Sequence, residues 1–147
     1  MALAGLGRLQ WYPEVKNVAA AENYFGRSLE ISEAIGDIIG QVKMHSLLGA
    51  CALEKDDLPR ALAHYERSWE LAGDTIDRCF AAIGLLRCYQ RQKCPDRFED
   101  IAQQLLGLLQ SEKIPVDCEA PLRAVLEGCS PESKSEAIGK LRELVQR

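Results

Sequence analysis

Apolar side chains recur at intervals of three and four residues along most of the 147-residue chain. This spacing gathers them on one side of an α-helix, whereas a half-buried strand would show strict alternation. No stretch alternates convincingly in that way, so the pattern predicts an all-α protein. The expected helices cover residues 2–12, 17–35, 39–54, 58–72, 77–92, 96–111 and 117–128, and an eighth, amphipathic helix opens at Ser130.

One helical segment occurs twice. Residues 21–32 align with residues 61–72 at a constant offset of 40, and the same offset carries the spacing onto a weaker third copy at Ile101, Leu105 and Leu108. Repeats of this period indicate stacked helix hairpins, each of which buries its apolar face against its neighbours. The matching pairs are Ala21 with Ala61, Phe25 with Tyr65, Arg27 with Arg67, Ser28 with Ser68, Glu30 with Glu70, and Ile31 with Leu71.

Turn and cap residues separate the expected helices. Asp57 precedes Pro59, so its carboxylate is placed to cap free backbone amides while the proline occupies the first turn. Residues 96–99 begin with Asp and end with Glu, which is the layout of a capping box. Gly-Asp pairs at 36–37 and 73–74 mark the points where helices end and the chain turns.

Residues 42–72 resemble the tetratricopeptide repeat. That family carries a Leu-Gly pair in the first helix of each hairpin, then a small residue twelve positions after the glycine, an aromatic residue, and another small residue. The corresponding positions here are Leu48, Gly49, Ala61, Tyr65 and Ser68. Gly49 and Ala61 are expected to let the two helices approach closely, and Tyr65 to fill the gap to the next hairpin.

The 40-residue period and residues 28–37 are similar to the long-repeat branch of this family. That branch includes kinesin light chains, Leu-Gly-Asn repeat proteins and bacterial regulators with helical arms. The other units depart from the pattern, because Gly7 lies two residues too far from Ala21 and Tyr89 stands where a glycine is expected. The resemblance implies an α-solenoid of about three hairpins in residues 1–112, closed within the same compact unit by capping helices in residues 113–147.

The resemblance also implies a site. In these families the first helices of successive hairpins line a concave groove that holds a partner peptide or helix. A carboxylate of the partner would be bound by Lys43, Arg87 and Gln90. The apolar surface of the groove would consist of Leu47, Leu53, Ile83 and Leu86. Ser46 and Ala50 do not reproduce the Lys and Asn of the chaperone-type carboxylate clamp. The groove candidates are Lys43, Ser46, Leu47, Ala50, Leu53, Ile83, Leu86, Arg87, Gln90 and Lys93.

Composition narrows the kinds of partner. Eighteen basic and 22 acidic residues give a formal charge of −4, which disfavours nucleic acid, and no apolar run is long enough to cross a membrane. We identify no signal peptide, and the six cysteines are expected to be reduced thiols in a cytoplasmic protein.

The sequence contains few residues in patterns that indicate metal binding or catalysis. No two cysteines have metal-ligand spacing, and His45 and His64 lie 19 residues apart, so no metal or other cofactor is expected. We expect His45 in the core and His64 on the hairpin surface. No nucleophile-elbow motif occurs, and the acidic pairs lie at helix starts, where capping accounts for them.

These observations favour a scaffold or adaptor that binds a protein partner, and not an enzyme. One alternative is a regulatory or sensor arm, or a secretion-type chaperone, from a larger protein, which could self-associate through an exposed N-terminal repeat face. The other alternative is a small helical enzyme that uses Cys88 or Cys94 as a thiolate.

Overall fold

The computed structural model describes residues 17–109, 113–127 and 139. Among these residues it contains helices and no strand, which confirms the all-α prediction. The helices predicted at 2–12 and from Ser130 onward lie outside the described residues, apart from the helical Gly139. The described helices are α2 (Val18–Ile35), α3 (Ile38–Glu54), α4 (Leu58–Leu71), α5 (Thr75–Gln92), α6 (Pro95–Leu109) and α7 (Val116–Glu127).

Side-chain caps fix where four of these helices start. Asn17, Asp37, Asp57 and Asp74 each accept a hydrogen bond from the backbone N–H three residues later, at 2.8 to 3.3 Å. Each bond satisfies one of the amides that a helix leaves free at its N-terminus. The cap predicted at Asp57 is therefore confirmed.

Two predicted boundaries need correction. The helix predicted from residue 77 begins at Thr75, because Asp74 supplies its cap. The capping box predicted at Asp96 is wrong, since α6 already begins at Pro95 and Asp96 lies in its first turn. Proline is favoured at the first helical position, where its missing N–H is not needed.

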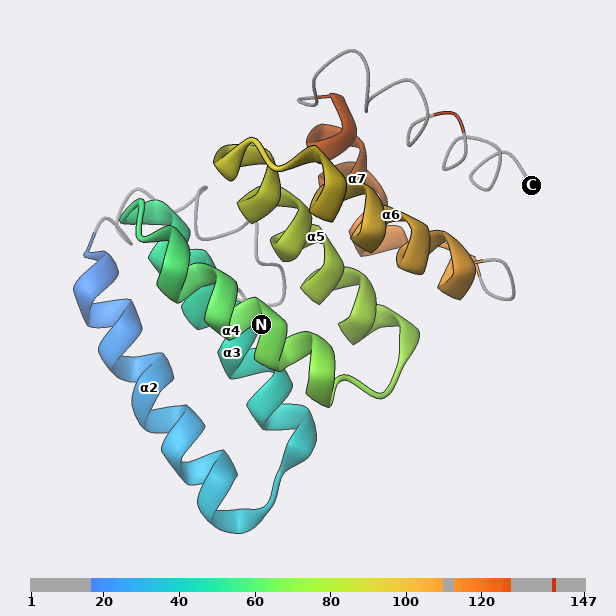
Figure 1. Cartoon of the computed structure of the whole chain (residues 1–147). Helices are drawn as coiled ribbons and strands as arrows, with labels where there is room; N and C mark the ends of the chain where they lie inside the picture. The colour runs from blue at the N-terminus through green and yellow to red at the C-terminus, as the bar shows by residue number, and fades with distance from the viewer. Residues whose placement is uncertain (1–16, 110–112, 128–138, 140–147) are drawn as a thin grey trace.

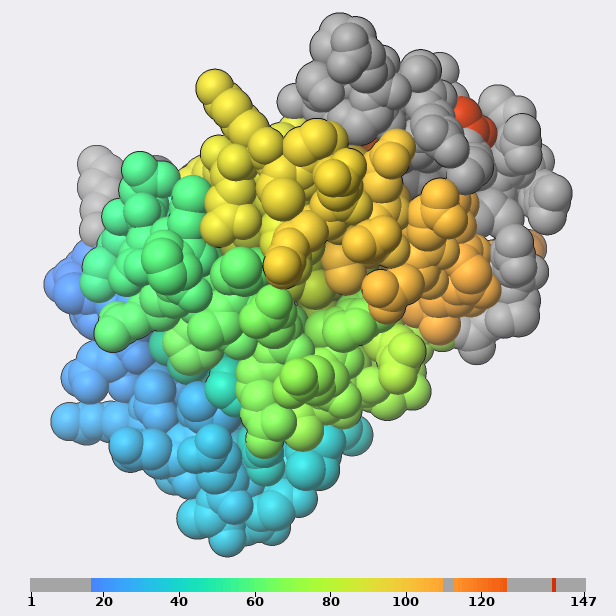
Figure 2. All heavy atoms as spheres, in the orientation of Figure 1, coloured from blue at the N-terminus to red at the C-terminus, as the bar shows by residue number. Residues whose placement is uncertain are grey.

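The helices pack in chain order and also across it. Each of α2 to α5 packs against the next helix, and short turns make consecutive helices antiparallel (Figure 1). In addition, α5 packs against both α3 and α7. Figure 2 shows the α2–α3 pair at one end of the described helices and α6 toward the other, with α4 and α5 between them.

The structural repeat has two different periods. The caps Asn17 and Asp57, which start α2 and α4, are 40 residues apart, in agreement with the sequence alignment. The caps Asp37 and Asp74, which start α3 and α5, are only 37 residues apart, because α4 has 14 residues where α2 has 18, while the turn after α4 is one residue longer. With the shorter period, Ala61, Tyr65 and Ser68 correspond to the buried residues Phe98, Ala102 and Leu105.

The ring of Tyr65 lies at the centre of the main core. Tyr65 belongs to α4 and has 0% exposed surface. A Cβ atom at Gly49 in α3 would lie 2.8 Å from this ring, and a Cβ atom at Gly84 in α5 would overlap it. The two glycines thus allow α3 and α5 to contact opposite parts of one aromatic ring. The sequence predicted Gly49 as a position of close helix approach, but it predicted neither its contact with Tyr65 nor the role of Gly84.

We predict that Gly84→Ala lowers the free energy of unfolding by about 1–3 kcal/mol, because the added methyl group must displace the Tyr65 ring. Gly26 in α2 is the matched control, since a Cβ atom there meets nothing within 4 Å. Gly26→Ala should therefore stabilise the protein by roughly 0.5–1 kcal/mol through helix propensity alone. Urea denaturation measures both changes, and equal effects of the two substitutions would contradict the proposed role of Gly84.

Candidate partner-binding surface

The structure distributes the ten predicted groove residues among three environments. Lys43 and Lys93 are exposed, and Arg87 and Gln90 are half-buried. The other six have little contact with solvent, so they contribute to packing in this structure: Ser46, Leu47, Ala50, Leu53, Ile83 and Leu86.

The buried Ser46 holds α3 against α4. Its hydroxyl lies 2.7 Å from the Ser68 hydroxyl, which donates a hydrogen bond to the Val42 carbonyl at 3.1 Å. Since the Ser68 hydroxyl has only one hydrogen, Ser46 must donate to Ser68. The small polar residues that the repeat pattern places here therefore join the two helices of one hairpin.

Gln90 and Lys93 have structural roles as well. The Gln90 side-chain amide donates a hydrogen bond to the Val125 carbonyl at 3.1 Å, which connects α5 to α7. Lys93 caps the C-terminal end of α5 in the left-handed conformation, with φ 56°. Of the other predicted polar residues, Lys43 is exposed and Arg87 is half-buried, so both side chains reach solvent.

The basic residue Arg91 of α5 contacts the preceding hairpin. Its guanidinium donates to the Leu53 carbonyl at 3.0 Å and lies 3.6 Å from the Asp56 carboxylate. These contacts join the end of α5 to the α3–α4 turn, where Asp56 has a positive φ of 59°. Arg91 therefore stabilises the packing of neighbouring hairpins.

The 37-residue period also changes which α5 residues correspond to those of α3. The counterparts of Ser46, Ala50 and Leu53 are Ile83, Arg87 and Gln90, all of which the sequence nominated. Lys43, however, corresponds to the half-buried Phe80, which the 40-residue alignment missed. The different lengths of α2 and α4 cause this shift of three positions.

The described cysteines form no disulfide. Cys88 is fully buried, and this burial raises the pKa of its thiol to about 12. A thiol with such a pKa is almost entirely protonated at neutral pH, which is unfavourable for thiolate chemistry at Cys88. Burial likewise raises the pKa of Cys51 to about 11.

Two histidines that are distant in sequence meet between α3 and α4. The Nδ1 atoms of His45 and His64 are 3.1 Å apart, and the ring centroids are 5.3 Å apart. His45 is 8% exposed, as expected for a core position, while His64 is only half-buried. Sequence reasoning missed this pair because only the packing of the hairpin brings the two positions together.

The surroundings of the pair favour neutral rings. Burial, with smaller effects of His64 and Arg67, lowers the pKa of His45 to about 4. Burial also lowers the pKa of His64, and Arg60 adds to this effect while Glu22 opposes it. Both imidazoles are therefore neutral at pH 7, with the Nδ1–H of one ring donating to Nδ1 of the other.

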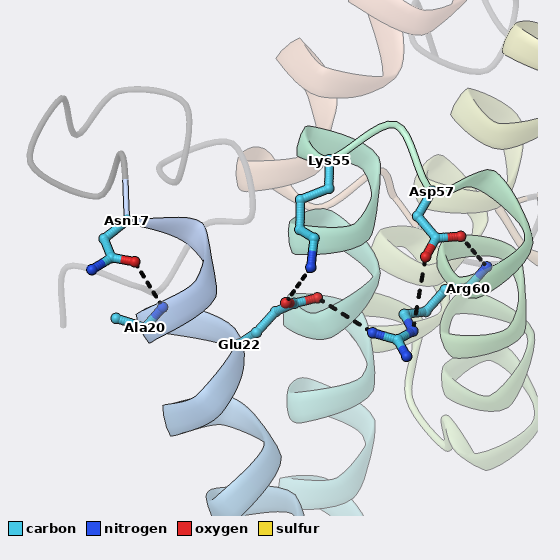
Figure 3. A network of polar contacts seen from close by, with 6 residues as sticks. All are labelled: Asn17, Ala20, Glu22, Lys55, Asp57 and Arg60. Atoms are coloured by element: carbon cyan, nitrogen blue, oxygen red, sulfur yellow. Dashed lines mark hydrogen bonds and ion pairs between the residues drawn. The ribbon is translucent and has the colours of Figure 1, made fainter.

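An ion-pair network lies between α2 and the α3–α4 turn (Figure 3). The Glu22 carboxylate accepts a hydrogen bond from Lys55 Nζ at 2.8 Å and lies 4.0 Å from Arg60, which also faces Asp57. Lys55 and Arg60 are largely exposed, so these pairs contribute little stability individually. The network also places charged groups near His64. The Glu22 carboxylate, which lies between the cationic side chains of Lys55 and Arg60, is one of them.

Comparison with known proteins gives no match: no family model, no curated protein and no solved structure is significantly similar to this chain. The tetratricopeptide resemblance therefore stays a prediction drawn from the residues. Within the described segments, no helix is long and apolar enough to span a membrane. The same segments contain no cluster of three or more metal-ligating side chains.

The histidine pair should make stability depend on pH. The pKa of His45 falls from 6.5 in the unfolded chain to about 4 in the folded one, so between these values the unfolded state binds more protons. Stability is therefore retained at pH 7 and lost as the pH falls through this window. We expect a loss of about 2 kcal/mol between pH 7 and pH 5.

Urea denaturation at the two pH values measures this loss. His45→Phe keeps a ring in the core but removes the titrating group, and it should reduce the difference between pH 7 and pH 5. An equally steep pH dependence in this variant would show that other groups cause the effect.

Proposed function

We propose that this chain is a protein-binding scaffold of the tetratricopeptide type, in which α3, α5 and α7 line a groove for a partner peptide or helix. One observation carries the proposal: α5 packs against both α3 and α7, although an intervening helix separates each pair in the sequence. Such contacts between the first helices of successive hairpins are what a right-handed superhelical stack produces. The proposal includes that the protein is cytoplasmic and that it acts by binding a protein partner, not by catalysing a reaction.

The accessible residues of this layer suggest the chemistry of the partner. Lys43 is exposed on α3, and Arg87 is half-buried on α5. A half-buried guanidinium is partly desolvated, so a carboxylate that reaches it forms a stronger hydrogen-bonded pair than one at an exposed lysine. Phe80 adds half-buried apolar surface on the same helix. The proposed partner is therefore an acidic segment with at least one apolar side chain.

We predict that Lys43→Glu/Arg87→Glu weakens partner binding by at least about tenfold, because it replaces both attractive charges with repulsive ones. Affinity capture from a lysate with wild-type and variant protein, followed by mass spectrometry and direct titration of the captured partner, measures the change. Gln90 is left intact because its bond to Val125 holds α7 in place.

The matched control is Arg27→Glu/Arg67→Glu, which changes the net charge equally but lies on the exposed surfaces of α2 and α4. The proposal requires that this control binds like the wild type. If the groove variant folds normally and retains the partner, the interface is elsewhere. Far-UV circular dichroism and the melting temperature report on the fold.

A separate observation favours self-association through α2 and the start of α3, as an arm of a larger assembly would show. Of the exposed large apolar side chains described, five are concentrated between residues 24 and 39, with exposed fractions of 48–71%. A concentration of this kind is typical of an interaction surface. These residues are Tyr24, Ile31, Ile35, Ile38 and Ile39.

If this surface self-associates, the molar mass from light scattering should rise with protein concentration, and Ile31→Glu/Ile35→Glu should hold the chain at the monomer mass of about 16.3 kDa. Val116 is 88% exposed but lies outside the cluster, so Val116→Glu is the control and should leave association unchanged. A monomeric wild type at millimolar concentration would contradict self-association.

A further inference from the structure

We propose that His45 and His64 form a binding site for a late first-row divalent transition ion, such as Zn²⁺ or Cu²⁺, held between the two Nδ1 atoms. The site shares α3 with the α3–α5–α7 layer through His45. It concerns the contact between α3 and α4, and it does not depend on the proposed scaffold function. Imidazole nitrogen is a preferred ligand of these ions.

The distance between the two Nδ1 atoms is close to that between two nitrogen ligands of one metal ion. Two imidazole nitrogens that ligate one ion at ~2.0–2.1 Å lie ~2.9 Å apart for a square-planar angle and ~3.4 Å apart for a tetrahedral one. The observed separation of 3.1 Å lies between these values. The separation of the nitrogens therefore matches a chelating pair, and each ring must turn so that its lone pair points at the ion and no longer at the other nitrogen.

The protonation state of the pair also suits a metal. The two Nδ1 atoms share one proton, so one ring is the Nδ1–H tautomer and the other is the Nε2–H tautomer. When an ion binds, the shared proton leaves Nδ1 and the same ring takes up a proton at Nε2. No net proton is released, because both rings are already neutral, as their lowered pKa values indicate.

Charged groups around the pair set how firmly an ion is held. Arg60 and Arg67 act on the histidines and repel a cation, whereas Glu22 attracts one. His64 is only half-buried, so water or a ligand from another molecule can complete the coordination. Because the described chain supplies two ligands and not three or four, the ion is exchangeable and is not a permanent structural metal.

Calorimetric titration of the full chain with Zn²⁺ at pH 7, under reducing conditions, tests the proposal. We expect one ion per chain in the wild type, and affinity at least about tenfold weaker in His45→Phe and in His64→Phe, because one remaining nitrogen cannot chelate. The half-buried Cys94 is the control for thiol binding. Cys94→Ser should bind Zn²⁺ like the wild type.

A second readout identifies the ligands without relying on affinity. Electron paramagnetic resonance of bound Cu²⁺ should show coupling to two nitrogen nuclei in the wild type and to at most one in each histidine variant. His64→Asn serves as a smaller replacement if the phenylalanine variant fails to fold. Equal Zn²⁺ affinity in the wild type and in a folded histidine variant, or loss of binding in Cys94→Ser, would overturn the proposal.

Discussion

The described structure depends on the contact of one aromatic ring with two glycines. Tyr65 of α4 is fully buried, and its ring occupies the space that side chains at Gly49 and Gly84 would need. Three helices are thereby held around one side chain, and any Cβ at Gly84 must move either the ring or the backbone of α5. The Tyr65 hydroxyl is buried without a hydrogen-bond partner among the described residues, so the contact is maintained by packing alone.

This close packing explains why most of the predicted groove is inaccessible. When α3 and α5 approach Tyr65, they also approach each other, and α7 covers part of α5. Leu53, Ile83 and Leu86 then belong to the continuous core that extends from α3 to α7. Among the predicted groove residues, the longer polar side chains of Lys43 and Arg87 still reach solvent.

Two polar side-chain pairs lie across the α3–α4 interface. They are Ser46 with Ser68 and His45 with His64, and each pair joins one residue of α3 to one of α4. Because an unpaired buried polar group is costly, these contacts select one alignment of the hairpin more strictly than apolar packing would. The same requirement places two imidazole nitrogens at a distance that suits a metal ion.

Sequence patterns were reliable for local structure. The three- and four-residue spacing identified all six described helices, and the caps at Asp57 and the Gly-Asp turns located several boundaries. These features depend on residues close together in the chain, so they can be read from the sequence. The resemblance to a known repeat also singled out Gly49 and Tyr65 as packing positions, but it did not predict that they contact each other.

Contacts between distant residues were decided by the tertiary structure. The sequence alignment carried the 40-residue period onto α5, but the caps of α3 and α5 are only 37 residues apart. Gly84, the second glycine against Tyr65, is 35 residues after Gly49, so neither period relates the two glycines. Likewise, nothing in the spacing of His45 and His64 indicated that their Nδ1 atoms lie 3.1 Å apart. The sequence thus determined the helices and their order, whereas helix lengths and packing register, which act across hairpins, decided which side chains are buried, paired or accessible.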